Sequence, residues 1–171
     1  MSVAVKIYRM SPYASLPEKG SAHAVGFDIR ADLSVLAKAT FKAQGEQVTL
    51  ESYLEGFSVK LLPREVKIIP TGLKIELPVD VELDIKSRSG LFSREGLLVQ
   101  GTIDPDYRGE IGIMMMNLSD KEVAVRHGER VAQGVFRQVL NADALLVEVK
   151  EEGSLSVTAR GEGGFGSTGK G

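Results

Sequence analysis

Apolar and charged residues alternate strictly over residues 79–86, and this pattern constrains the fold more than any other feature of the sequence. A period of two places the apolar side chains on one face of a β-strand and the charged side chains on the other. Residues 73–77 alternate in the same way, and Pro78 separates the two predicted strands. Further short strands are predicted at residues 3–7, 123–125, 131–136 and 145–149. Together with 19 glycines, these strands predict an all-β sandwich, jelly roll or barrel.

Two segments depart from simple alternation. Residues 89–96 predict a short helix that begins directly after Arg88, with Ser89 able to cap its start and Gly96 able to end it. Residues 111–117 are apolar on both faces of a predicted strand. This second pattern fits either a subunit interface or an ordinary sandwich core.

The chain is long enough for one well-buried domain, which we assign to residues 1–159. Within this domain, residues 37–62 are ambiguous, because their aromatic and aliphatic residues suit either a strand or a loop that folds over the body. Residues 160–171 contain six glycines and almost no core-forming residues. We therefore expect a flexible C-terminal arm.

Composition excludes several classes of function. A net charge of −2 argues against a nucleic-acid partner. The absence of cysteine excludes thiolate zinc sites and a cysteine nucleophile, and the two histidines lie far apart, so oxygen ligands and Mg²⁺ or Ca²⁺ are expected for any metal. Neither a signal peptide nor an apolar run of the roughly 20 residues that a membrane span needs is visible. We expect a soluble cytoplasmic protein that does not bind membranes.

Three segments are rich in groups that bind phosphate or activate water. Residues 87–90 combine an arginine fork and hydroxyls with the start of the predicted helix, where free backbone N–H groups favour an anion. The arm nearly matches a P-loop, but Gly171 stands where that motif needs Ser or Thr. Residues 104–109 predict a hairpin connection in which Asp104, at the end of an apolar strand, is a candidate general base.

Five segments resemble, in order, the five motifs of the trimeric dUTPase family. The matching segments are residues 24–29, 88–91, 101–109, 128–133 and 160–169. The resemblance covers residues 6–169, with residues 37–62 as its main gap. It implies a jelly-roll-like β-clip fold, a homotrimer with three shared active sites, and an arm that closes over a neighbour's nucleotide. The implied activity is Mg²⁺-dependent hydrolysis of dUTP to dUMP and pyrophosphate, which limits uracil in DNA and supplies dUMP for thymidylate synthesis.

The resemblance also implies residue roles. Asp104 would activate the attacking water, and Asp28 would hold Mg²⁺ through one of its water ligands. The implied phosphate-binding residues are Arg88, Ser89, Gly90, Gln133, Arg160, Ser167 and Thr168. The implied uracil- and deoxyribose-binding residues are Leu98, Gly101, Thr102, Ile103, Tyr107, Gly112, Phe165 and Gly166. Among these, the backbone would select uracil, Gly112 would leave room for the base, Tyr107 would pack under the sugar, and Phe165 would stack on the ring.

Three features depart from the family pattern. Ser87 replaces a usual proline, which is expected to loosen that turn, and Gly134 replaces a larger aliphatic residue. Residues 37–62 are longer than usual and are expected to form a surface loop or hairpin.

Two alternatives to the dUTPase activity remain. A dCTP deaminase shares the fold but needs a catalytic Glu where this chain has Met114, and methionine cannot shuttle protons. A nucleotide-sensing binding module, or an added regulatory protein partner, is compatible with residues 37–62 but does not follow from them.

Overall fold

The computed structural model describes residues 4–41, 50–140, 147–151 and 154–158. One antiparallel sheet has the strand order β1-β5-β8-β7-β6-β10-β3-β2, and a second sheet pairs β4 with β9. The strands of the large sheet are β1 (Lys6–Arg9), β2 (Glu18–Lys19), β3 (Phe27–Arg30), β5 (Val66–Glu76), β6 (Val81–Lys86), β7 (Leu97–Ile103), β8 (Glu110–Asn117) and β10 (Arg130–Gln138). Strands β4 (Ser58–Leu61) and β9 (Val123–Arg126) form the small sheet. The all-β, jelly-roll-like prediction is confirmed.

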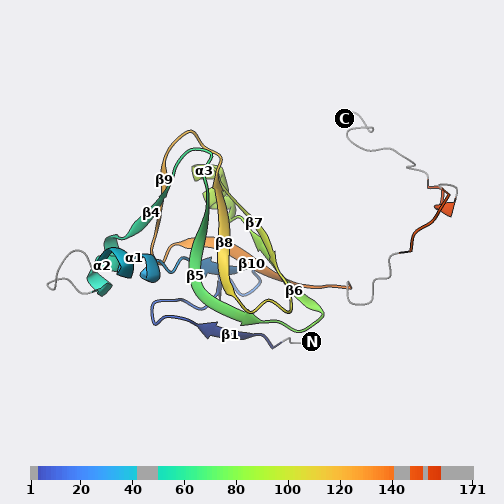
Figure 1. Ribbon diagram of the computed structural model, residues 1–171, viewed down its shortest axis with the longest axis horizontal. Helices are drawn as coiled ribbons and strands as arrows, with labels where there is room; N and C mark the ends of the chain where they lie inside the picture. Colours follow the sequence, from blue (N-terminus) through green and yellow to red (C-terminus); the bar gives the residue numbers. More distant parts are fainter. Residues whose placement is uncertain (1–3, 42–49, 141–146, 152–153, 159–171) are drawn as a thin grey trace.

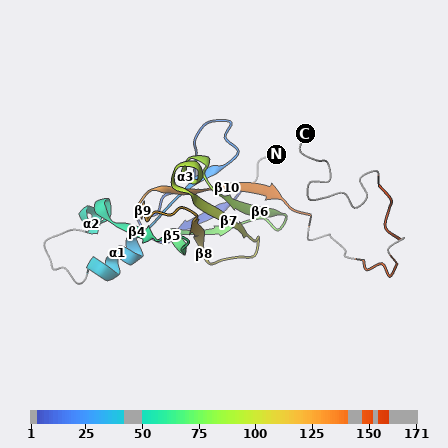
Figure 2. The same ribbon diagram turned by 90° about the horizontal axis from the view of Figure 1, so that it is seen from above.

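The large sheet curls, so that its two halves enclose the core (Figures 1 and 2). Strands β5, β8 and β7 form one wall, and β6, β10 and β3 form the other. The alternation over residues 81–85 points Val81, Leu83 and Ile85 inward, where each is at most 6% exposed. Removal of such apolar surface from water is the main force that favours the curled sheet.

Helix α3 (Ser89–Glu95) confirms the predicted helix after Arg88. Its N-cap is Arg88, in extended conformation and without a side-chain capping bond, so Ser89 does not cap it. Gly96 ends the helix with a φ of 69°, and its N–H donates to the Phe92 carbonyl. This left-handed conformation is one that glycine adopts without steric cost.

In the described part of residues 37–62, the expected surface loop or hairpin is not formed, and the strand that was the other expectation is confirmed only at residues 58–61. The described part contains most of helix α1 (Ser34–Phe41), all of helix α2 (Leu50–Gly56) and strand β4. The rings of Phe41, Tyr53 and Phe57 follow one another at centroid distances of 5.7 and 5.5 Å. These aromatic contacts explain why the segment folds into helices that pack on each other at one end of the body (Figure 1).

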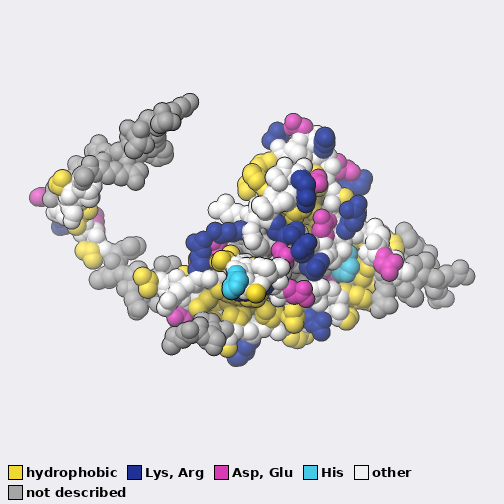
Figure 3. Space-filling view, turned by 180° about the vertical axis from the view of Figure 1, so that it is seen from behind, with side chains coloured by type: hydrophobic (Ala, Val, Ile, Leu, Met, Phe, Trp, Pro, Cys, Tyr) yellow, Lys and Arg dark blue, Asp and Glu magenta, His cyan; other side chains and the backbone are white. Residues whose placement is uncertain are grey.

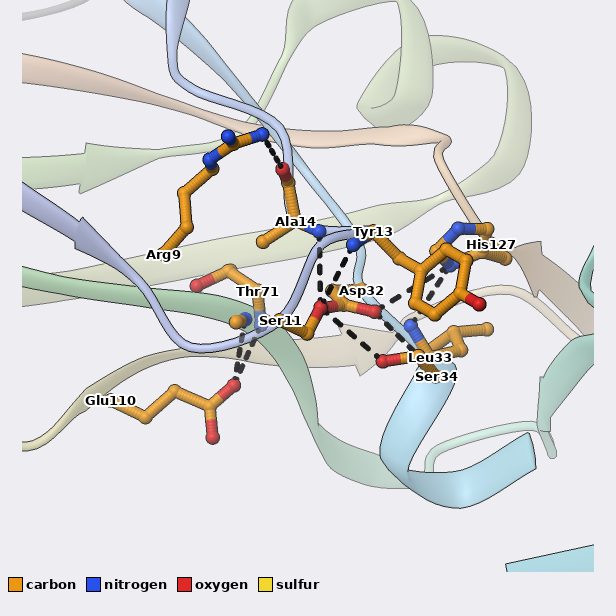
Figure 4. Close-up of polar contacts among 11 residues, drawn as sticks. Arg9, Ser11, Tyr13, Ala14, Asp32, Leu33, Ser34, Thr71, Glu110 and His127 are labelled. Carbon is orange, nitrogen blue, oxygen red and sulfur yellow. Dashed lines mark hydrogen bonds and ion pairs between the residues drawn. The ribbon is translucent and has the colours of Figure 1, made fainter. Parts of the chain in front are cut away.

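A buried polar cluster anchors α1 to the body (Figure 4). Asp32, only 2% exposed, accepts hydrogen bonds from the Ser11 hydroxyl and from the Ser34 backbone N–H. His127 lies in the turn after β9, and its side chain points inward, where Nδ1 accepts the Leu33 N–H at 3.1 Å. The cluster satisfies the polar groups at the start of α1, as burial requires.

The predicted strand at residues 145–149 is wrong over residues 147–149, which have no strand assignment, while residues 145 and 146 lie outside the described residues. Val147 is 71% exposed, and the described part of this segment lies away from the sheet (Figure 2). Without a neighbouring strand or core, its alternation has nothing to pair with or pack against. No helix among the described residues is long and apolar enough to cross a membrane.

Candidate active site

The first group of predicted site residues meets around the carboxylate of Asp28. Arg88 Nε lies 2.9 Å from Asp28 Oδ1, and Arg130 NH1 lies 3.1 Å from Asp28 Oδ2. Arg88 also donates to the backbone carbonyl of Arg130 at 3.2 Å. Seen from the side opposite to Figure 1, Lys and Arg side chains gather over the body (Figure 3). Planar guanidinium groups such as those of Arg88 and Arg130 bind phosphate oxygens well.

Gln133 belongs to the same group, because it stands opposite Asp28 in the pairing of β10 with β3. Its Nε2 donates to the Ser87 carbonyl at 3.0 Å. A Cβ on Gly26 would lie 2.8 Å from Gln133 Oε1 and 3.3 Å from Gln133 Cβ, so glycine lets this side chain pack closely against the backbone. In this structure Gln133 supports the turn that presents Arg88.

Ser87 does not loosen that turn, contrary to the expectation from its replacement of proline. Its hydroxyl donates to the Val99 carbonyl at 3.1 Å and accepts the Val99 N–H at 2.6 Å. The turn before α3 is therefore tied to β7 from both sides. Ser89 and Gly90, at the start of α3, follow directly, and a Cβ on Gly90 would lie 3.1 Å from Arg94 NH2.

The second group surrounds the connection from β7 to β8. Asp104 follows β7, and its carbonyl accepts the Tyr107 N–H at 3.1 Å. The Tyr107 hydroxyl donates to the Glu110 carbonyl at 3.0 Å, and its ring lies where a side chain on Gly109 would be. An open groove of about 760 Å³ lies here. Its lining residues are Leu77, Val79, Glu82, Asp104, Pro105, Asp106, Arg108 and Val139.

Strands β7 and β8 separate as they approach this connection. Their pairing runs from Leu97 opposite Asn117 to Val99 opposite Met115, and no further β7–β8 pair is present in the described strands. Beyond that point, the β8 side of Gly101, Thr102 and Ile103 has backbone groups that no β8 partner uses. An open groove of about 420 Å³ lies beside them, lined by Val66, Leu98, Gln100, Gly101, Met114 and Met116.

Gly112 does not provide empty space in this chain. A Cβ at Gly112 would lie 2.5 Å from Cγ2 of Ile68 on β5, so a neighbouring aliphatic side chain already fills that position. Gly112 therefore makes room for Ile68, and the expectation that it also makes room for a base stays a prediction.

The two groups lie at opposite ends of the β6–β7 pair. Leu83 stands opposite Ile103 and Lys86 opposite Gln100, so Asp104 follows one end while Arg88 follows the other. At about 3.3 Å per residue, this register separates Arg88 from Asp104 by roughly 20 Å along the sheet. The predicted residues Arg160, Phe165, Gly166, Ser167 and Thr168 lie outside the described residues.

The described residues contain no group of three or more His, Cys, Asp or Glu side chains that could enclose a metal. In the part of the chain that the structure describes, Asp28 is the carboxylate that pairs with these two arginines. A donor set of one carboxylate suits Mg²⁺, which commonly keeps water ligands and takes its other oxygens from substrate phosphates.

Known proteins match both the sequence and the fold of this chain. The family model described as dUTPase matches residues 52–169. A deoxyuridine 5'-triphosphate nucleotidohydrolase of Heliobacterium modesticaldum is 36% identical over 169 residues, which cover 96% of each chain. The protein of the same description from Hydrogenobaculum sp. is 44% identical over 144 residues, or 82% of this chain and 94% of the relative. The chain belongs to the dUTPase family.

Solved dUTPases agree with this assignment. The dUTPase of Staphylococcus bacteriophage 80alpha, solved with dUPNHPP, superposes with a TM-score of 0.75 at 25% identity and covers 98% of this chain and 99% of its own. A dUTPase from phage phi11 of S. aureus, whose structure visualises a species-specific insert, has a TM-score of 0.67 at 20% identity. It covers 89% of this chain and 99% of its own, and it supports the fold alone.

Sequence reasoning missed Arg130 among the residues around Asp28. It lies within residues 128–133, the segment that resembles the family's fourth motif, but strand alternation alone places it on the face opposite to Gln133. The adjacent apolar residues Val131 and Ala132, both buried, are compatible with a β-bulge here but do not by themselves predict it.

Proposed function

We propose that this protein hydrolyses dUTP to dUMP and pyrophosphate with Mg²⁺, as its family membership and the identity of its relatives support. The observation that carries the proposal is the presence of both halves of such a site on one sheet. Arginines that suit a triphosphate lie at one end of the β6–β7 pair, and a carboxylate beside an unpaired strand edge lies at the other.

In the proposed reaction, Asp104 accepts a proton from the water that attacks the α-phosphorus, and pyrophosphate leaves. Arg88, with Ser89 and Gly90, neutralises charge on the phosphates, and Gln133 contributes on the α-phosphate side. When bound, Mg²⁺ supplies further charge neutralisation on the phosphate oxygens. Asp28 would hold this ion through one of its water ligands.

Uracil would be read by backbone groups at the β7 edge, around Leu98, Gly101, Thr102 and Ile103. Strand β8 pairs with Leu98 but leaves the edge unpaired at Gly101, Thr102 and Ile103, which supports the proposal. Cytosine would leave buried donors and acceptors mispaired, at a cost of about 1–3 kcal/mol for each group. Tyr107 would pack under the deoxyribose, and Phe165 would close over the base.

We further propose a homotrimer. Arg88 cannot reach a phosphate beside Asp104 across roughly 20 Å of its own sheet, so the two groups must meet through different chains. Val66, Ile68, Leu98 and Met114, all at least 36% exposed, form an apolar strip that suits burial between chains. The arm, with Arg160, Ser167 and Thr168, would grip the γ-phosphate. A cytoplasmic location, without nucleic-acid or membrane partners, belongs to the same proposal.

The deaminase alternative is not favoured. Met114 stands where that chemistry needs a glutamate, and its side chain is 54% exposed on the apolar strip. A regulatory protein partner has no specific support in the described contacts.

The decisive test is pyrophosphate release from dUTP, with dCTP, dTTP and UTP as controls, by wild type and by Asp104→Asn. We expect Mg²⁺-dependent release that is selective for dUTP and falls by at least about 10²-fold in the variant, because proton transfer contributes on that order. Folding of the variant is checked by thermal unfolding. A wild type without activity on dUTP, or one that releases ammonia from dCTP, would refute the proposal.

A further inference from the structure

A β-bulge in β10 turns Arg130 toward Asp28. Gln133 stands opposite Asp28 and Arg130 opposite Arg30, with a register shift between Arg130 and Ala132. In a regular strand, residues 130 and 133 would face opposite sides of the sheet. The extra residue of the bulge places both on the side of Asp28. Val131 and Ala132, adjacent in sequence, are both fully buried, as this geometry requires.

Each carboxylate oxygen of Asp28 accepts a hydrogen bond from a different arginine, and the two arginines have different proposed roles. Oδ1 is bound by Arg88, which the proposed function assigns to the substrate phosphates, and Oδ2 is bound by Arg130. The Arg88 guanidinium also donates to the Arg130 backbone. Without substrate, the three residues therefore form a closed set, and Asp28, 19% exposed, has a partner for each oxygen.

We infer that Arg130 is a positioning residue that keeps Asp28 Oδ2 when Arg88 moves to a phosphate, so that Oδ1 becomes available to a water ligand of Mg²⁺. The inference rests on the proposed function. Without Arg130, the departure of Arg88 would leave the partly buried Asp28 carboxylate unpaired. An unpaired buried charge costs free energy, and the carboxylate would be free to rotate. With Arg130 in place, the carboxylate keeps one charge-assisted hydrogen bond and its orientation.

This arrangement couples the metal to the nucleotide. In the free protein, a divalent cation meets an Asp28 whose two oxygens are already paired with guanidinium groups. Only a phosphate that takes Arg88 releases Oδ1. Mg²⁺ should therefore bind weakly alone, and Mg²⁺ and nucleotide should each strengthen the binding of the other, since such coupling is reciprocal.

The test is calorimetric titration with dUPNHPP, the imido analogue of dUTP, with and without Mg²⁺. For each variant, the readout is the ratio of the two dissociation constants. We expect Arg130→Gln to lower the Mg²⁺-dependent gain in affinity by about tenfold, the lower range for residues that orient metal ligands. The Mg²⁺-free affinity should change less than about threefold, and Arg130→Lys should restore part of the gain.

Arg137→Gln is the matched control. Arg137 lies on the same strand, its side chain is 49% exposed against 46% for Arg130, and it also pairs with an aspartate, Asp84, at 3.0 Å. Its loss should leave the ratio unchanged. In an Asp28→Asn background, Arg130→Gln should lower the ratio no further.

Three results would overturn the inference. An equal loss of affinity with and without Mg²⁺ in Arg130→Gln would mean that Arg130 binds the phosphates itself, while the proposed function would stand. A further tenfold loss of the ratio in the Asp28→Asn background would mean that Arg130 does not act through Asp28. A wild type that does not bind dUPNHPP at all would refute the proposed function, and the inference with it.

Discussion

At the scale of single residues, two hydrogen bonds of Ser87 replace the stiffness that a proline ring would give. Proline restricts the chain by fixing φ, whereas the Ser87 hydroxyl ties the turn to both backbone groups of Val99. The sequence revealed the substitution but not this compensation, because Val99 lies 12 residues away and only the β6–β7 register brings it close. The same limit applies to Arg130, since strand alternation does not reveal the bulge.

Glu65 provides a pH-dependent contribution to stability at the same scale. The hydrogen bond from Lys67, together with the Leu62 backbone N–H at 2.7 Å, holds the pKa of the Glu65 carboxyl below its ordinary value of 4.5. Because the folded state favours the ionised form, this contribution is complete above the unfolded pKa and is lost as pH falls through the folded pKa. We expect wild type to be more stable than Glu65→Gln at pH 7, and the difference to shrink as pH falls below 4.5 and to vanish once pH is below the folded pKa.

Urea unfolding of both proteins between pH 3 and pH 7 measures this difference. Asp120→Asn, which removes an exposed carboxylate paired with Arg64, is the control and should change stability little at any pH. A difference between wild type and Glu65→Gln that stays constant across this range would contradict the prediction.

At the scale of elements, strands β5 and β6, whose alternation packs against the core, were predicted correctly, whereas residues 147–149 form no strand and the helices of the insert were not predicted. Val81, Leu83 and Ile85 reveal their strand because one face is buried and the other solvated. Helices α1 and α2 have no such signature, since they are short and their aromatic residues pack on one another. The Asp32 cluster that anchors α1 joins segments distant in sequence, which local patterns cannot reveal.

In strand β10, side chains of neighbouring strands fill the space beside Gly134. A Cβ at Gly134 would lie 2.7 Å from Leu83 Cδ1 and 3.2 Å from Ile29 Cδ1. We expect Gly134→Leu to destabilise the fold by about 1–3 kcal/mol through overpacking. Adding Leu83→Ala should recover part of that loss, because it removes the side chain that collides.

Urea unfolding of the two single variants and the double variant gives the coupling between the sites. The sum of the losses of stability in the two single variants should exceed the loss of stability in the double variant. Strictly additive losses would show that Leu83 does not fill the space beside Gly134.

At the scale of the whole molecule, the separation of Arg88 from Asp104 makes assembly a condition of activity. Met114 lies on the apolar strip proposed for the trimer and is 54% exposed. We expect Met114→Asp to shift the protein to monomers in sedimentation velocity at micromolar concentration and to abolish dUTP hydrolysis, because a buried unpaired charge is costly.

Met10→Asp is the control, since Met10 is 45% exposed and outside the strip. It should leave both assembly and activity unchanged. A Met114→Asp monomer with full activity would show that one chain completes the site alone.

The early separation of β7 from β8 also bears on how this protein can evolve. After Val99 and Met115, base recognition is proposed to fall to peptide groups, which every amino acid carries. Single substitutions along this edge therefore exchange side chains without exchanging the donors and acceptors that read the base. A change of base preference would need an insertion, a deletion or a shift in the pairing register of β7. Point mutations along this edge alone should leave the selection of the base largely unchanged.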